Sequence, residues 1–355
     1  MRHALLAALI GLLASTSSRA DEAALDSVFS DWRGRHRIDT AILVVEDRGR
    51  IVFEKASGTR RAGDRVLISS LSKAITASCA AVLIRDGKLR LDTKLEAVLA
   101  EEINAAEVAA DSPLRTVTVE ELMIHRAGLG RDADRAFGAV QRRQLDSVAP
   151  SDVDIRAATV ATLGSVMSLA SRGRYDYSTF GYVLLGQAIE RASGEPYATV
   201  CARTVLTPAG VANAGLDPVW GFRYAAGGWQ LSGREYLAFL RHMPLSAEWV
   251  GATVAQWTLD PAGKESRAPV FYSLGILVRP TGGSYEILHS GALAWNQHSR
   301  KNGLLYNSTQ AYAARNADGI GLFVFGEFCF PDNPGCFNDP GWSALSRQVF
   351  EATRR

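Results

Sequence analysis

The sequence predicts an α/β fold in which strands from both ends of the chain form one sheet and a mostly helical segment is inserted between them. Two observations lead to this prediction. Strand-like runs occur near both ends, within 41–53 and 272–325, whereas helical periodicity dominates the middle of the chain. We expect a discontinuous sheet domain over 21–90 and 265–355, a helical subdomain over 91–264, and an active-site cleft at their junction.

The composition is that of a globular protein, with 47% hydrophobic and 21% charged residues in a chain of 355. A chain of this length usually divides its core between two subdomains. Its first residues have the pattern of a secretory signal, because Arg2 precedes an apolar run over 4–14 and small residues lead up to Ala20. We therefore expect residues 1–20 to be removed, and a periplasmic or secreted protein without a transmembrane anchor.

Loss of that signal would also change the charge balance. It would remove two of the 39 lysines and arginines and leave 37, equal to the 37 acidic residues. Nucleic acids and other polyanions require a concentrated basic surface. We therefore expect no nucleic-acid partner.

The four cysteines are consistent with an oxidising compartment. Cys329 and Cys336 bracket a short loop, and we expect them to form a disulfide that contributes about 2.5 kcal/mol by closing it. Cys79 and Cys201 each fall within an apolar helical pattern. We interpret this second pair as buried thiols in preference to a second disulfide.

The N-terminal part predicts a helix followed by a β-hairpin. The helix is expected over 22–36, and apolar strand-like runs follow at 41–45 and 51–53. Gly49 lies in the turn between these runs, where glycine supplies a positive φ. The sheet therefore starts here.

Three helices are expected in the next part of the chain, each with a glycine at its end. Their apolar residues recur at helical spacing, and the second begins with a capping box of threonine and glutamate. They are expected over 69–86 before Gly87, from Thr118 and Glu121 up to Gly128, and over 182–192 before Gly194. Strand-like runs then return at 272–278, 285–289 and 321–325.

Ser70 and Lys73 are the first candidates for chemistry, because a spacing of three residues places their side chains on the same face of a helix. A serine needs a neighbouring base to act as a nucleophile, and a desolvated lysine can lose its proton near neutral pH. The helix N-terminus favours a developing oxyanion. Such a short pattern has a chance expectation of roughly 0.5 occurrences here, so a solvated lysine on an ordinary helical turn is the alternative.

Two further segments supply complementary groups. Tyr177 precedes a helix, and a phenol near a lysine can relay a proton to a leaving group. His289 ends a strand-like run, and Gly291 would let a substrate lie against the backbone near the N–H of Ala292. An open strand edge of this kind binds extended amides. Taken singly, the tyrosine and the histidine are more often structural residues.

In order and context, these segments resemble the serine β-lactamase and penicillin-binding-protein superfamily. The resemblance is to the branch of class C β-lactamases, D-alanyl-D-alanine carboxypeptidases and esterases, and it covers roughly residues 35–350. The segments that carry it are Ser70-Leu71-Ser72-Lys73, the run 116–129 with His125 and Gly128, the run 177–197, Ala226-Gly227-Gly228, and His289-Ser290-Gly291.

The resemblance implies the β-lactamase/transpeptidase-like fold, an antiparallel sheet flanked by helices with a mostly helical subdomain, and a reaction without cofactor or metal. It implies that Ser70 is acylated, with Lys73 and Tyr177 sharing proton transfer. His289 would line the opposite wall, while His125 would have a structural role. Backbone N–H groups of Ser70 and Ala292 would form the oxyanion hole, and the implied substrate contacts are Thr179, Ser290, Gly291 and Ala292.

The chain departs from the family pattern at three places. Thr179 stands where the family has an asparagine that binds the amide of peptide-like substrates, Arg126-Ala127 replaces Thr-Ser, and His289 stands where the better-known lactamases have lysine. We expect a serine hydrolase that cleaves a small ester, an amide or a D-amino-acid peptide. The alternative is a weak or inactive relative that binds peptidoglycan-derived or acylated ligands in the same cleft.

Overall fold

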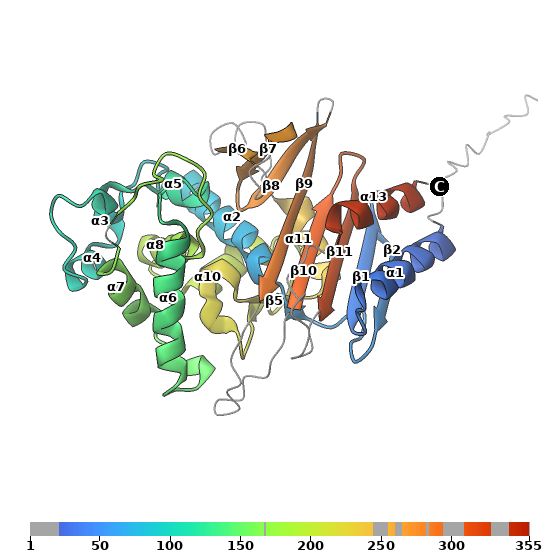
Figure 1. Cartoon of the computed structure of the whole chain (residues 1–355), viewed down its shortest axis with the longest axis horizontal. Coiled ribbons are helices and arrows are strands. Elements are labelled where there is room, and N and C mark those ends of the chain that lie inside the picture. Colours follow the sequence, from blue (N-terminus) through green and yellow to red (C-terminus); the bar gives the residue numbers. More distant parts are fainter. Residues whose placement is uncertain are drawn as a thin grey trace, which may run out of the picture.

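The computed structural model describes residues 21–166, 168–243, 255–259, 265–281, 284–293, 309–327 and 341–354. Its centre is an antiparallel sheet of eight strands with helices on both faces, and further helices extend from one end of the sheet (Figure 1). This confirms the predicted fold class, whereas the boundaries of the helical insert stay a prediction. The expected signal over 1–20 and the pair Cys329 and Cys336 lie outside the described residues.

The large sheet combines strands from both ends of the chain, in the order β2-β1-β11-β10-β9-β8-β7-β6. A second sheet has the order β3-β5-β4. The strands are β1 (Ala41–Asp47), β2 (Arg50–Ser57), β3 (Val66–Leu67), β4 (Gly215–Leu216), β5 (Trp229–Leu231), β6 (Ala255–Leu259), β7 (Glu265–Ser273), β8 (Ile276–Thr281), β9 (Ser284–Leu293), β10 (Thr309–Arg315) and β11 (Ile320–Glu327).

The helices fall into those that cover the sheet and those that build the helical part. The covering helices are α1 (Glu22–His36), α2 (Ser72–Arg85), α11 (Gly233–His242) and α13 (Trp342–Thr353). The others are α3 (Leu95–Val98), α4 (Ala100–Ala105), α5 (Val119–Met123), α6 (Gly130–Leu145), α7 (Ile155–Leu163), α8 (Thr179–Ser193), α9 (Tyr197–Cys201) and α10 (Tyr224–Gly227). Short 3₁₀ segments include η1 (Ser69–Leu71), η2 (Pro113–Thr116), η3 (Pro150–Asp152) and η5 (Gly221–Arg223), and a π-helical turn, η4, spans Ala202–Leu206.

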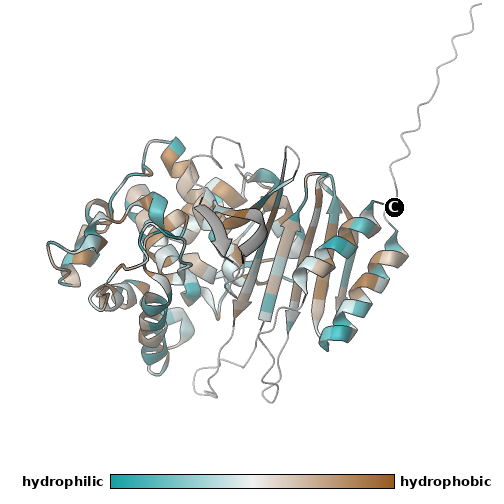
Figure 2. Cartoon of the chain, turned by 45° about the horizontal axis from the view of Figure 1, so that its top comes forward, coloured by the Kyte–Doolittle hydropathy of each residue, from teal (hydrophilic) through white to brown (hydrophobic). Residues whose placement is uncertain are grey.

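Strand β1 shows why the sheet needs helices on both faces. Successive side chains of a strand point to opposite faces. Leu43 and Val45 pack in one apolar cluster with residues of α1 and α13, while Ile42 and Val44 pack in another with residues of α2 and α11. In Figure 2 the strands are mostly brown, whereas the outer helices carry more teal. None of the helices in the described part of the chain is long and apolar enough to cross a membrane.

The N-terminal elements follow the predictions. The helix spans 22–36 as expected, and β1 pairs with β2 in an antiparallel hairpin. Arg48 and Gly49 form its two-residue turn, both with positive φ, 48° and 88°. Two successive residues with positive φ are typical of a type I′ turn, whose twist matches that of the flanking strands.

Two element boundaries differ from the predictions. The run 272–278 is two strands joined by a turn, because Leu274 and Gly275 both have positive φ. A Cβ on Gly275 would collide with the carbonyl group of Lys73, so this turn lies directly on α2. Helix α5 begins with the predicted capping box but ends at Met123. Gly128 is needed for another reason, since a Cβ there would lie 2.6 Å from the backbone nitrogen of Arg172.

The interpretation of Cys79 and Cys201 as free thiols was wrong. The two form a disulfide between α2 and α9, with Cα atoms 5.3 Å apart and 122 residues between them in sequence. Both are fully buried. An apolar helical pattern indicates that a cysteine is buried but does not reveal which buried residues face each other. A buried free cysteine and a cysteine of this disulfide therefore give the same sequence pattern.

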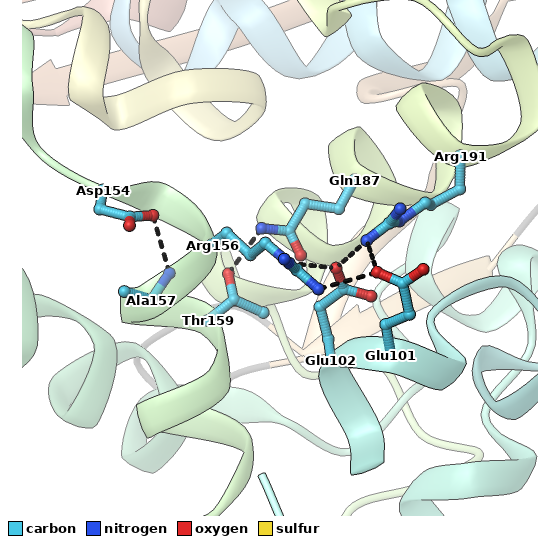
Figure 3. Close-up of polar contacts among 8 residues, drawn as sticks. All are labelled: Glu101, Glu102, Asp154, Arg156, Ala157, Thr159, Gln187 and Arg191. Carbon is cyan, nitrogen blue, oxygen red and sulfur yellow. Dashed lines mark hydrogen bonds and ion pairs between the residues drawn. The ribbon is translucent and has the colours of Figure 1, made fainter. Parts of the chain in front are cut away.

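A buried carboxylate holds the helical part together (Figure 3). Glu102, in the first turn of α4, accepts hydrogen bonds from Arg156 of α7 at 2.9 Å and from Arg191 of α8 at 2.6 Å. Its side chain is 2% exposed. Burial acts to raise the pKa of Glu102, but the hydrogen bonds from the two arginines outweigh it and the pKa is lowered. The ionised form therefore stabilises the fold.

Replacing Glu102 by glutamine should lower the free energy of unfolding by about 1–3 kcal/mol at pH 7, because both arginines lose their buried partner. The matched control is Glu101→Gln, since Glu101 pairs with the same two arginines from a side chain that is 64% exposed. We expect that control to cost less than about 1 kcal/mol. Folding lowers the pKa of Glu102. Denaturant titrations should therefore show the wild type to be more stable than Glu102→Gln above pH 5. This difference should disappear as the pH falls below about 4.3, the pKa of glutamate in the unfolded chain. Equal effects of the two substitutions would contradict this assignment.

Candidate active site

Ser70 lies in the 3₁₀ turn η1, which runs directly into α2. The residue before it, Ser69, has a positive φ of 48°. A non-glycine residue in this region is strained, and such strain concentrates at functional sites. One turn further along, the Lys73 Nζ donates to the Ser70 Oγ at 3.2 Å and to the carbonyl oxygen of Ala226 at 2.7 Å. The expected pairing of hydroxyl and amine is therefore present in the structure.

Lys73 is fully buried, and this changes its chemistry. Burial lowers its pKa from 10.5 to about 7, an effect that the negative charge of Asp134 partly opposes and the positive charge of Arg223 reinforces. At neutral pH, a large fraction of the lysine is therefore unprotonated. An unprotonated amine within hydrogen-bond distance of a serine hydroxyl can accept its proton.

Tyr177 lies over the same lysine. Its ring centroid is 5.0 Å from the Lys73 Nζ. Burial raises the pKa of Tyr177 well above 10, although a hydrogen bond with Ser70 offsets part of the rise. The phenol is therefore protonated at neutral pH and available as a donor beside Ser70.

Asp134 of α6 fixes the segment that carries Tyr177. Its carboxylate accepts hydrogen bonds from the Ser178 Oγ at 3.0 Å and from the backbone N–H groups of Thr179 at 2.9 Å and Phe180 at 2.8 Å. These groups form the N-terminus of α8, where a negative charge is stabilising. Nothing in the sequence near position 134 marked this residue.

His125 supports Tyr177 from the other side. The two rings lie 4.2 Å apart, and the His125 Nδ1 accepts a hydrogen bond from the backbone N–H of Ser178 at 3.1 Å. Burial holds the pKa of His125 well below its usual range, so the ring is neutral. It packs among tyrosines, with Tyr182 at 5.0 Å and Tyr272 at 4.6 Å between ring centroids.

The opposite wall is the C-terminal half of β9. This strand pairs with β10 from Ile287 to Leu293, but its described pairing with β8 stops at Leu288. The edge beyond Leu288 therefore has no strand partner from β8, and Ser290 and Ala292 line a cavity there. A Cβ on Gly291 would lie 2.6 Å from the carbonyl oxygen of Ile68 and 2.8 Å from the backbone nitrogen of Ser70. Glycine is thus required for the close approach of β9 to the serine.

His289 is neutral at physiological pH. It is 5% exposed, and its Nδ1 lies 2.6 Å from the carbonyl oxygen of Ser290. Burial and the charge of Lys73 lower the pKa of His289 to about 4, against the effect of this hydrogen bond. The ring is therefore an uncharged part of the wall.

The cavity measures about 370 Å³ and brings most of the predicted residues together. Its lining consists of Ser70, Tyr175, Tyr177, Tyr272, Leu277, His289, Ser290 and Ala292. Three predicted residues, Lys73, Thr179 and Gly291, are not part of this lining. The backbone N–H of Thr179 donates to Asp134 at the start of α8. Tyr175, Tyr272 and Leu277 were not predicted. Among the described residues, no group of three potential ligands is arranged to hold a metal ion.

Comparison with known sequences places the chain among serine hydrolases. The family described as Beta-lactamase matches residues 25–326. Esterase EstB of Burkholderia gladioli is 29% identical over 204 residues, which cover 55% of this chain and 51% of the relative. Penicillin-binding protein 4 of Amycolatopsis lactamdurans is 28% identical over 203 residues, covering 54% and 48%. The chain thus spans about half the length of the curated relatives it matches.

Solved structures share the fold over nearly the whole chain. A D-stereospecific amidohydrolase from Streptomyces sp. has a TM-score of 0.68 at 19% identity and covers 94% of this chain and 98% of its own. D-amino acid amidase from Ochrobactrum anthropi SV3, complexed with L-phenylalanine, has a TM-score of 0.64 at 16% identity, with 93% and 98% covered. Together with the match over 25–326, these findings confirm the resemblance: the chain belongs to the Beta-lactamase family of serine hydrolases.

Proposed function

We propose that this protein acts through an acyl-enzyme on Ser70 and cleaves a small ester, an amide or a D-amino-acid peptide in the periplasm or outside the cell. The observation that carries the proposal is the Lys73 Nζ, buried and 3.2 Å from the Ser70 Oγ with a pKa of about 7. A lysine kept only as a structural residue would gain nothing from this burial, which disfavours its protonated form.

In the acylation step, unprotonated Lys73 takes the proton of Ser70 while the Oγ attacks the carbonyl carbon of the substrate. The resulting oxyanion accepts hydrogen bonds from the backbone N–H groups of Ser70 and Ala292. Tyr177 donates its proton to the leaving group and is reprotonated by the Lys73 ammonium. A water molecule then hydrolyses the acyl-enzyme, with the same groups moving protons in the reverse direction.

The names of the relatives support the ester and amide classes. One curated relative is called an esterase and another a penicillin-binding protein, and a structural neighbour is called a D-stereospecific amidohydrolase. Small molecules and peptides, including peptidoglycan-derived ones, are therefore the substrates to test. The alternative of an inactive binder is disfavoured because Ser70, Lys73 and Tyr177 are all present and in mutual contact.

Covalent labelling tests the proposal. A fluorophosphonate probe and a fluorescent penicillin should be tried on the protein, and at least one is expected to label it, with the label lost in Ser70→Ala. The matched control is Ser78→Ala, because Ser78 lies on α2, the helix that directly follows Ser70, is buried, and its Oγ makes no hydrogen bond. Labelling that survives in Ser70→Ala would exclude Ser70 as the nucleophile. Failure of both probes on a folded protein would support the inactive binder.

A further inference from the structure

We propose that the cavity beside Ser70 binds an uncharged aromatic group of the substrate, so that the enzyme selects esters or amides with neither a carboxylate nor an ammonium group next to the scissile bond. This inference rests on the proposed function and adds the chemical class of the substrate. It depends on the walls of the cavity, on its charge and on its size.

Half of the eight lining residues carry aromatic rings, namely Tyr175, Tyr177, Tyr272 and His289. The ring of Tyr272 lies 5.7 Å from that of Tyr175, 6.3 Å from that of Tyr177 and 5.9 Å from that of His289, measured between centroids. Tyr177 and Tyr272 are perpendicular, at 89°. Leu277 of β8 adds an aliphatic surface. Tyr272 is fully buried, whereas Tyr175 and Tyr177 are partly exposed. A further aromatic ring would therefore pack edge-to-face or offset against Tyr175 and Tyr177, with Tyr272 behind them.

The lining carries no fixed charge among the described residues. None of its side chains is a carboxylate, a lysine or an arginine. His289 is neutral above its pKa of about 4, and burial keeps the phenols of Tyr175 and Tyr177 protonated. Asp134, whose charge acts on Lys73 and Tyr177, already accepts three hydrogen bonds at the start of α8. A charged substrate group entering the cavity would lose its hydration without gaining an ionic partner in this lining, because Lys73 is fully buried and is not one of the lining residues.

The size of the cavity suits one ring and a short linker. An apolar cavity of about 150 Å³ is sufficient for benzene, and this cavity measures about 370 Å³. Besides the phenol hydroxyls and the His289 ring, its polar groups are Ser70 and the β9 edge at Ser290 and Ala292, which belong to the proposed reaction centre. A substrate would therefore place its carbonyl group at that end and its aromatic ring among the tyrosines.

The charge preference can be measured with esters that differ in one group. We would compare 4-nitrophenyl phenylacetate with analogues that carry an ammonium or a carboxylate group on the carbon next to the carbonyl. A second series would carry the ring and the charge on the alcohol, as in benzyl butyrate, because either side of the ester could occupy the cavity. In at least one series, kcat/KM of the neutral ester should exceed those of both charged analogues by about tenfold or more. Equal or better turnover of a charged analogue in both series would overturn the proposal.

Leu277 offers matched variants, because its side chain lines the cavity without belonging to the proton-transfer groups. Leu277→Arg should raise kcat/KM of the carboxylate analogue relative to the neutral ester by about tenfold, and Leu277→Glu should do the same for the ammonium analogue. Leu277→Gln is the uncharged control and should leave the ratios near those of the wild type. Persistent fluorophosphonate labelling would show that each variant is folded. If the variants are labelled but their ratios of kcat/KM for the charged and neutral esters are unchanged, the proposal is overturned. If the wild type is not labelled at all, the result counts against the proposed function itself.

Discussion

Replacing Lys73 by arginine is expected to lower kcat/KM for an ester by about 10³-fold. Arginine keeps a positive charge but cannot lose its proton in this pH range, so the proposed base for Ser70 would be lost. Its larger head group also has to fit a fully buried position that donates to the carbonyl oxygen of Ala226. Steady-state hydrolysis of 4-nitrophenyl esters and the rate of fluorophosphonate labelling would both measure the loss.

The pH dependence of the wild type follows from the same residue. The pKa of Lys73 is about 7, and the proposed mechanism requires its unprotonated form. The value of kcat/KM should therefore be low at pH 5, rise through about pH 7 and level off above pH 8. A profile governed by His289, with its pKa of about 4, would already be level at pH 6 and would contradict Lys73 as the base.

Lys73→Met separates loss of chemistry from loss of folding. Burial lowers the pKa of Lys73 from 10.5 to about 7, which corresponds to about 4 kcal/mol of lost stability at pH 7. Methionine would remove this cost, although the carbonyl oxygen of Ala226 would lose a donor at about 1–3 kcal/mol. The variant should thus be inactive but at least as stable as the wild type at pH 7. The free energy of unfolding of the wild type should increase relative to that of the variant as the pH rises from about 7 to 10.5. In that window, Lys73 binds fewer protons in the native state than in the unfolded state.

The contact between Ser70 and Lys73 could be predicted because its geometry is local. Ser70 and Lys73 are three residues apart on one helix, so their contact follows from the helix period alone. The same holds for the capping box of Thr118 and Glu121, and for the turn at Arg48 and Gly49. In each case the sequence spacing determines the distance in space.

The parts that were missed depend on contacts between distant segments. Asp134 binds the start of α8 from another helix, and nothing in the local pattern of α6 indicates that partner. Cys79 and Cys201 share the apolar surroundings of many buried residues, so their pairing could not be read from either pattern. The role of Thr179 in substrate binding stays a prediction, and the additional bond from its backbone N–H to Asp134 has no local sequence signal.

Gly291→Ala is expected to have the second largest effect, a decrease of about 10²-fold in the rate of acylation. The added Cβ would lie 2.6 Å from the carbonyl oxygen of Ile68 and 2.8 Å from the backbone nitrogen of Ser70. Both are backbone atoms that cannot rotate away, so β9 has to move away from the serine. Donors of an oxyanion hole must lie about 2.7–3.1 Å from the oxyanion, and a displacement of about 1 Å can cost 10²-fold in rate.

The control for this substitution is Gly138→Ala on α6. A Cβ there would come no closer than 3.6 Å to Arg142, and alanine favours a helix over glycine by about 0.5–1 kcal/mol. We expect Gly138→Ala to keep full activity and a slightly higher melting temperature. Near-normal acylation in Gly291→Ala would show that the separation of β9 and Ser70 does not limit the reaction, and the oxyanion hole would then have to be formed by groups other than the backbone N–H groups of Ser70 and Ala292.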